Sequence, residues 1–153
     1  MAHIVCNIAK GRARELYNRV KSNDPANSGI VLVPLEAAGI AADADLKRYD
    51  TLADLLAGST NEQGTMGRVV LSDAQIAALP APDDTNDWAT FALPNFGWTA
   101  ATGSAIAKIA VCYDPDTTAG TDAAVVPMVI FDFAATPSGL DINVTGGDVF
   151  RAT

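Results

Sequence analysis

Two long apolar segments joined by an acidic turn constrain this chain more than any other feature. The segments are Ser104–Tyr113 and Ala124–Phe133, and Asp114–Asp122 lies between them. Both are rich in β-branched and aromatic residues and are bounded by turn formers, which is typical of β-strands. The charged residues inside them are Lys108 and Asp132. Because a strand that is apolar on both faces is normally covered on both faces, we expect this hairpin to form the centre of a β-rich domain.

Length and composition predict one globular domain over residues 1–153. Of the 153 residues, 49% are hydrophobic and 18% are charged. A chain of this length and hydrophobic content can bury a core that is stable without a metal or a disulfide. The 12 Gly and 8 Pro residues fall mostly between apolar runs, a spacing that favours many short strands. The expected fold class is mainly β with short helices (α+β): an antiparallel β-sandwich or barrel-like single domain with an N-terminal helix.

The N-terminal segment combines an apolar stretch with an amphipathic helix. Residues 2–8 are mildly apolar, so they form either an edge strand or an arm that reaches a neighbouring molecule, and residues 1–10 are the candidate arm. Helical spacing follows over Ala9–Lys21. The apolar face of this helix carries Ala9, Ala13, Leu16, Tyr17 and Val20.

Charge is distributed unevenly along the chain, whose net charge is −8. The segment 10–21 holds five of the ten basic residues and one acidic residue, a formal charge of +4 that leaves −12 for the remainder. This asymmetry indicates a basic segment that meets an acidic surface, its own or a partner's, and the alternative is a solvated helix face. The overall acidity disfavours a nucleic-acid partner. The candidate partner-contact residues are Lys10, Arg12, Arg14, Arg19 and Lys21.

The remaining pattern predicts further strands and short helical pieces. The strands are expected over Gly29–Leu35, Met66–Leu71, Trp88–Leu93, Leu140–Thr145 and Val149–Arg151. Thr51 has the position of an N-cap and Gly58 that of a C-cap for a helix over Thr51–Ala57. Ser72 and Gln75 have capping-box spacing, which predicts one or two helical turns over residues 73–79. Loops or turns are expected at residues 22–28, 80–87, 137–139 and 146–148.

No motif in the chain points to catalysis, so we expect no catalytic residues and a protein that is not an enzyme. His3 is the single histidine, and nothing near it specifies a Ser-His-Asp or Cys-His-Asn arrangement. Cys6 and Cys112 lie in apolar stretches and are expected to be buried free thiols. No GxGxxG or GxxxxGK[ST] pattern is present, so no nucleotide and no other cofactor is expected.

Two acidic loops and two tryptophans have alternative interpretations. The loops carry Asp83, Asp84 and Asp87, and Asp114, Asp116 and Asp122. Their oxygens are ligands of the kind that Ca²⁺ prefers. Because the second loop departs from the EF-hand pattern, we expect solvated turns capped by Asp, and we expect no metal site. Trp88 and Trp98 fit either a glycan-binding surface or burial in a β core, and burial is favoured by their small and apolar neighbours.

Targeting signals are not visible. Met1–Lys10 lacks a basic start followed by a long apolar run and a cleavage site. No apolar run approaches the roughly 20 residues of a membrane helix. We therefore expect a soluble protein made in a cytoplasm, with no membrane partner.

Groups of residues spread over most of the chain carry a resemblance to a known family. The densest are in the second half: Cys112–Asp116, Asp122–Ala123, Val126–Pro127, Asp132–Phe133, Thr136–Gly139 and Phe150–Ala152. Earlier groups are Tyr17–Val20, Asn23–Asn27, Tyr49–Ala53, Asp83–Asp87, Leu93–Pro94 and Trp98–Gly103. On these groups the chain resembles small structural proteins of tailed bacteriophages, of the capsid decoration (cement) type. It departs from them at Met128–Val129, where members often have a Leu-Thr pair.

The resemblance implies a role as a virion protein on the capsid surface. Such proteins bind the outside of the shell of major capsid protein, are often trimers, and assemble in the host cytoplasm. The implied partners are therefore the phage major capsid protein and sister copies of the chain, with the basic residues between Lys10 and Lys21 as the candidate contact. The alternative is a tail-associated or head-fibre module with receptor or glycan binding.

Overall fold

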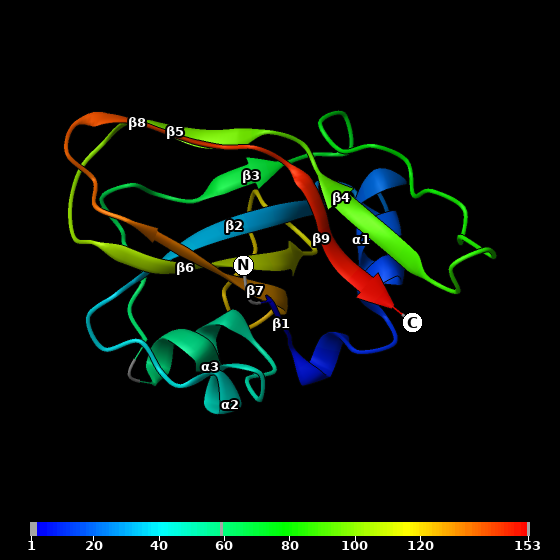
Figure 1. The fold of residues 1–153 in the computed structure, drawn as a ribbon, viewed down its shortest axis with the longest axis horizontal. Helices are drawn as coiled ribbons and strands as arrows, with labels where there is room; N and C mark the ends of the chain where they lie inside the picture. Colours follow the sequence, from blue (N-terminus) through cyan, green and yellow to red (C-terminus); the bar gives the residue numbers. More distant parts are fainter. Residues whose placement is uncertain (1–2, 59, 153) are drawn as a thin grey trace.

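The apolar hairpin lies in the middle of a five-stranded antiparallel sheet, as predicted. The computed structural model describes residues 3–58 and 60–152, and in it β6 (Ile106–Asp114) pairs with β7 (Val126–Ala135) and with β2 (Gly29–Glu36). At the edges lie β1 (His3–Val5) and β3 (Val69–Leu71). The strand order is β1-β7-β6-β2-β3 (Figure 1).

A long two-stranded ribbon runs beside this sheet. It consists of two antiparallel pairs, β4 (Ala89–Leu93) with β9 (Gly147–Ala152) and β5 (Phe96–Ala101) with β8 (Leu140–Val144). Since β4 leads directly into β5 and β8 into β9, the two pairs follow each other along one ribbon. Figure 1 shows this ribbon along one side of the sheet and the helices α2 (Asp43–Leu46) and α3 (Leu52–Ala57) along the other.

Each face of the sheet carries its own apolar core. Alternate residues of β2 separate to the two sides: Ile30 and Leu32 pack toward the ribbon, and Val31 and Val33 toward α2 and α3. The helix α1 (Ala13–Lys21) completes the ribbon-side core with its predicted apolar face, which is buried. The second core takes Leu46, Leu52 and Leu55 from α2 and α3. The mainly β fold with short helices and antiparallel sheets is therefore confirmed, and so is the cover on both faces of the hairpin.

The N-terminal segment follows the edge-strand alternative. Strand β1 pairs with β7 of the same chain, with Ile4 opposite Ile130, and a 3₁₀ turn, η1 (Asn7–Ala9), buries Ala9. The helix begins at Ala13 and not at Ala9, because Gly11 adopts a φ of 80° that a right-handed helix does not allow. Residues 1 and 2 of the candidate arm lie outside the described residues, and a contact of this segment with a neighbour stays a prediction.

Two further elements differ from the sequence prediction, and a third agrees with it. Strand β2 runs one residue beyond its predicted end at Leu35, to Glu36. It passes through Pro34 because β3 stops short of Pro34, whose carbonyl accepts from the Gln63 N–H at 2.9 Å. The expected Ser72–Gln75 capping box forms, with the Ser72 N–H donating to Gln75 Oε1 at 3.0 Å, but it closes a turn and no helix follows. The short helix α3 has its predicted cap, since Thr51 Oγ1 accepts from the Asp54 N–H at 3.0 Å.

Candidate functional site

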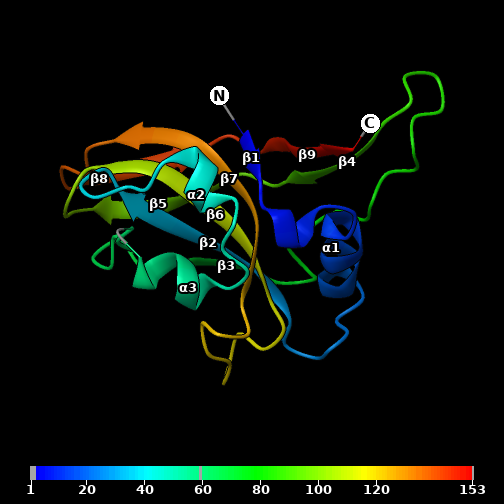
Figure 2. The ribbon, with the colours of Figure 1, turned by 90° about the horizontal axis from the view of Figure 1, so that it is seen from below.

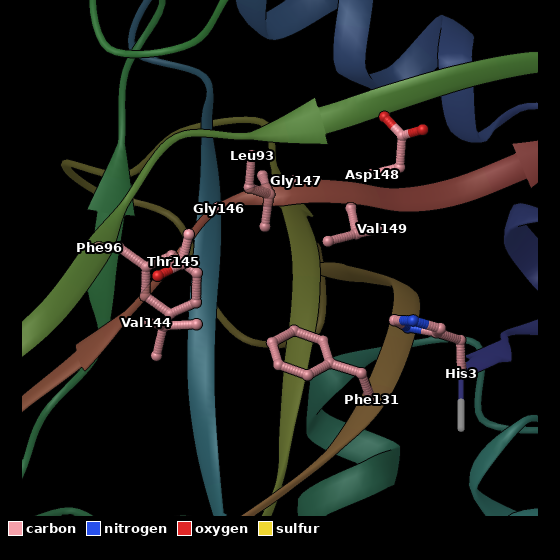
Figure 3. A pocket seen from close by; sticks show the side chains of 10 residues that line it. All are labelled: His3, Leu93, Phe96, Phe131, Val144, Thr145, Gly146, Gly147, Asp148 and Val149. Carbon is pink, nitrogen blue, oxygen red and sulfur yellow. The ribbon is translucent and has the colours of Figure 1, made fainter. Parts of the chain in front are cut away.

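An apolar pocket of about 210 Å³ opens between the β1–β7 edge of the sheet and the ribbon. Figure 3 shows the residues that line it, which come from β1, β7, the junction of β4 with β5 and the segment where β8 leads into β9. Its walls are mostly apolar side chains, and His3, Thr145 and Asp148 are its polar ones. The lining comprises His3, Leu93, Phe96, Phe131, Val144, Thr145, Gly146, Gly147, Asp148 and Val149.

A kink in the ribbon shapes this pocket. A Cβ at Gly146 would lie 2.2 Å from the Leu93 carbonyl oxygen, so only glycine fits where the chain leaves β8. The Gly146 N–H donates to Asn95 Oδ1 at 2.8 Å across the ribbon. The register shifts at Phe91, so that Val149 is an extra residue on β9. The segment 146–148 is therefore a kink in a ribbon and not a hairpin turn, and the bulge blunts the free edge of β9.

The polar groups of the pocket do not form an acid–base pair. The His3 ring lies 6.1 Å from the Phe131 ring, and Figure 3 shows the Asp148 carboxylate pointing away from His3. Asp148 instead approaches Arg151, at 4.0 Å. This geometry suits the burial of an apolar group.

Two of the five predicted contact residues bind the protein's own backbone. Arg14 Nη2 donates to the Pro80 carbonyl at 2.6 Å. Lys21 Nζ donates to the carbonyls of Asp73 and Ile76 at 2.8 and 2.9 Å. Both cations therefore fasten α1 to residues 73–80.

The other three predicted contact residues face solvent. Arg19 Nε donates to Glu15 Oε1 at 2.6 Å, and Arg12 lies 3.8 Å from the same carboxylate. The hydrogen bond to Glu15 raises the pKa of Arg19. Lys10 is exposed. We call Lys10, Arg12 and Arg19 the basic surface, and one acidic residue, Glu15, lies among them.

The acidic loop of residues 80–87 projects from the body of the protein (Figure 2). Asp83 holds its turn: Oδ1 accepts from the N–H groups of Thr85 and Asn86, at 3.0 and 3.1 Å. The hydrogen bonds from Asn86 lower the pKa of Asp83. Asp116 likewise holds the hairpin turn, where its Oδ1 accepts from Thr118 Oγ1 at 2.6 Å. The expectation of turns capped by Asp is confirmed at these two residues.

Asp122, grouped with the hairpin loop in the sequence, belongs instead to an ion cluster around Arg68. Arg68 Nη1 lies 2.6 Å from Asp122 Oδ1, and Nη2 lies 2.6 Å from Glu62 Oε2. Both carboxylates accept two hydrogen bonds from the guanidinium. The hydrogen bond to Arg68 lowers the pKa of Asp122, and those to Glu62 and Asp122 raise the pKa of Arg68. The cluster joins the hairpin turn to the segment before β3.

We expect the contribution of Asp122 to stability to disappear in acid. Its folded-state pKa is lowered, so the stabilisation is complete above the unfolded pKa of about 3.9 and is lost as the pH falls through the folded value. Asp122→Asn should cost about 1 kcal/mol at neutral pH, because the group is partly exposed, and nothing at about pH 2. Urea unfolding at several pH values measures this difference. Asp50→Asn, at an exposed position, is the control, and a cost for Asp122→Asn that persists at about pH 2 would contradict the assignment.

The two charged residues inside the hairpin strands pair with each other. Lys108 lies opposite Asp132 in the β6–β7 register, and its Nζ contacts Asp132 Oδ1 and, at 3.0 Å, Asp43 Oδ1 of α2. Burial opposes the charged amine, but the hydrogen bonds to the two carboxylates outweigh it and raise the pKa of Lys108. This cluster fastens α2 to the sheet.

The remaining singled-out residues are mostly in the core. Cys6 and Cys112 are buried free thiols, as predicted, and burial raises the pKa of Cys6 to about 12. Trp98 is 6% exposed and its Nε1 donates to the Gly67 carbonyl at 2.9 Å, so its predicted burial is confirmed. Trp88 is only half-buried and lies outside the core, contrary to the expected burial, and the Arg151 guanidinium lies 3.8 Å from its ring centre.

Within residues 3–58 and 60–152, no group of three or more His, Cys, Asp or Glu side chains is arranged to hold a metal ion. None of the helices in the same ranges has the length and apolar composition that crossing a membrane requires. Comparisons with protein-family models, with curated protein sequences and with solved structures gave no match.

Proposed function

We propose that this chain is a structural protein of a tailed bacteriophage virion, a capsid decoration (cement) protein. In this role it binds the outside of the shell of major capsid protein and stabilises the shell. Its partners are the major capsid protein and sister copies of itself, in a homo-oligomer that we expect to be a trimer. It assembles on the virion in the host cytoplasm and acts without catalysis.

The observation that carries this proposal is the resemblance of its turn and strand residues to those of phage decoration proteins. In the fold these residues specify the scaffold. Asp114 and Asp116 order the hairpin turn through the Asp114 Oδ1 contact with the Asp116 N–H at 2.9 Å. Asp132 pairs with Lys108, and Trp98 and Pro137 are buried. The shared residues therefore determine the body of the protein, which supports a common architecture and a common role.

The exposed features of the fold suit a protein that acts by contact. The acidic loop of residues 80–87 projects from the body (Figure 2). The basic surface lies along α1 and at its start, with Lys10 and Arg12 just before the helix and Arg19 on it. Charged projections of this kind set partner choice and orientation in protein assemblies. A two-sided core beneath them gives a rigid support for such contacts.

The glycan-binding alternative has no exposed tryptophan platform at Trp98. Its ring packs against Phe96 at a centroid distance of 5.8 Å inside the ribbon-side core. A tail-associated or head-fibre location is the competing prediction, for which the half-buried Trp88 is the remaining candidate contact.

Binding to empty phage heads tests the proposed function. Purified protein is mixed with heads that lack it, and the heads are pelleted by centrifugation. We expect saturable co-sedimentation and heads that withstand higher temperature; binding to isolated tails in place of heads would contradict the decoration role. Truncation of residues 1–10 is unsuitable as a test of the contact surface, because it removes β1 and the buried Cys6 and Ala9. Substitutions on the basic surface avoid this damage.

A further inference from the structure

Two oppositely charged surfaces lie at the same end of the molecule. Figure 1 places α1 and the C-terminal end of β9 at this end, and the acidic loop extends from it. Contacts join the three: Arg14 on α1 donates to Pro80 at the start of the loop, and Arg151 on β9 covers Trp88 at its end. The acidic surface consists of Asp83, Asp84 and Asp87. The basic surface consists of Lys10, Arg12 and Arg19.

A groove of about 300 Å³ lies at the base of the acidic loop. Its apolar wall is formed by Pro82, Trp88, Ala89 and Ala152, and the carboxylates of the acidic surface line the rest. An apolar wall beside carboxylates fits a long cationic side chain, whose stem packs on the apolar atoms while its head meets the acids. The Arg151 guanidinium already covers one face of the Trp88 ring, at 3.8 Å from its centre, so an incoming side chain would pack on the other apolar atoms of the groove.

The two surfaces do not neutralise each other within one subunit. In the described ranges 3–58 and 60–152, the ion pairs of Arg12 and Arg19 are with Glu15, and none joins either arginine to the loop. In the same ranges Asp83, Asp84 and Asp87 form no ion pair with a basic side chain. The acidic surface therefore presents uncompensated charge to solvent, and the basic surface keeps a net positive charge because the single carboxylate of Glu15 pairs with two of its three cations.

We propose that the groove binds the basic surface of a second copy of this chain, with Lys10 and Arg12 of one subunit against the acidic loop of the next. Charge complementarity between the two exposed surfaces supports this occupant. Both surfaces lie at one end of the subunit. A rotation axis placed beside that end would bring the basic surface of each subunit against the acidic loop of the next, and the contacts would close into a ring. This contact rests on the homo-oligomer proposed above, but it is measured on the purified protein alone, so its failure can be told apart from failure of shell binding.

Matched charge variants test this contact. The loop variant is Asp84→Lys with Asp87→Asn. It keeps Asp83, which orders the turn. Residue 87 is changed to Asn because its φ is 54°, a left-handed conformation that Asn tolerates. The second variant is Lys10→Glu with Arg12→Glu; we call it the helix variant because both substitutions lie just before α1. The control, Asp50→Lys with Asp45→Asn, makes the same change in net charge as the loop variant, at exposed positions near α2 and α3.

Sedimentation velocity over a concentration series measures self-association. We expect the wild-type protein and the control to associate, and each of the two interface variants to associate at least about tenfold more weakly. An equal mixture of the loop and helix variants should associate again. The loop variant keeps its basic surface and the helix variant keeps its acidic loop, so these two intact surfaces can bind each other. Added salt should weaken the wild-type contact.

Three outcomes would overturn the proposal. The first is a wild-type protein that stays monomeric up to about 100 μM. The second is association that the loop and helix variants leave unchanged, and the third is a mixture that fails to restore it. Circular dichroism of each variant shows that the fold is retained. Loss of shell binding with intact self-association would instead contradict the virion role and leave this contact standing.

Discussion

Replacing Phe91 with alanine is expected to lower the free energy of unfolding by about 3–5 kcal/mol, the usual cost of truncating a fully buried aromatic side chain. Phe91 is 0% exposed and lies on β4 of the ribbon. Its ring stacks on Tyr17 of α1 at 4.8 Å and on Phe150 of β9 at 5.4 Å. The large loss is expected because the substitution opens a cavity where the ribbon and α1 meet.

Urea unfolding followed by tryptophan fluorescence measures this loss. Phe133→Ala is the matched control, because Phe133 is only half-buried at the margin of the same core, and it should cost about 1 kcal/mol. Equal losses for the two variants would show that Phe91 does not join the ribbon to the helix as described.

Replacing Arg68 with methionine is expected to cost about 2–3 kcal/mol, which is less than for a fully buried ion pair because the group is partly exposed. The side chains of Arg68, Glu62 and Asp122 are 28%, 20% and 37% exposed. Without the guanidinium, two half-buried carboxylates would face each other with no cation between them. The hairpin turn would also lose its tie to the segment before β3.

Thermal and urea unfolding of Arg68→Met, alone and combined with Asp122→Asn, give the coupling between the two side chains. We expect the double variant to be more stable than the sum of the two single losses predicts. Arg48→Met is the control, because the Arg48–Asp45 pair is highly exposed, at 68% and 57%, and such pairs contribute little. If Arg68→Met lowered the free energy of unfolding by no more than Arg48→Met does, the cluster would not stabilise the fold.

The central hairpin could be predicted because local pattern determines it. β-branched residues on both faces of residues 106–114 and 126–135 require cover on both sides, and the structure provides the ribbon and α1 on one side and α2 and α3 on the other. The apolar spacing of α1 and the Thr51 cap are local signals of the same kind. Lys108 and Asp132 were visible as the charged residues inside the strands, and the register pairs them.

The parts that could not be predicted depend on long-range placement. Arg68 is 54 positions from Asp122 and carries no local signal of their pairing. The ribbon arises because β4 pairs with β9 and β5 with β8, while sequence spacing favoured a turn at residues 146–148. The basic segment can be recognised in the sequence as a run of charges. Which of its cations bind residues 73–80 and which face solvent depends on how α1 packs.

The central claim is that this chain decorates the outside of a phage head. A density map of phage particles that carry the protein tests it most directly, because the five-stranded sheet with its ribbon can be fitted as one rigid body. We expect density of this shape on the outer surface of the capsid shell, in contact with the major capsid protein. Density of this shape in the tail, with none on the capsid shell, would contradict it.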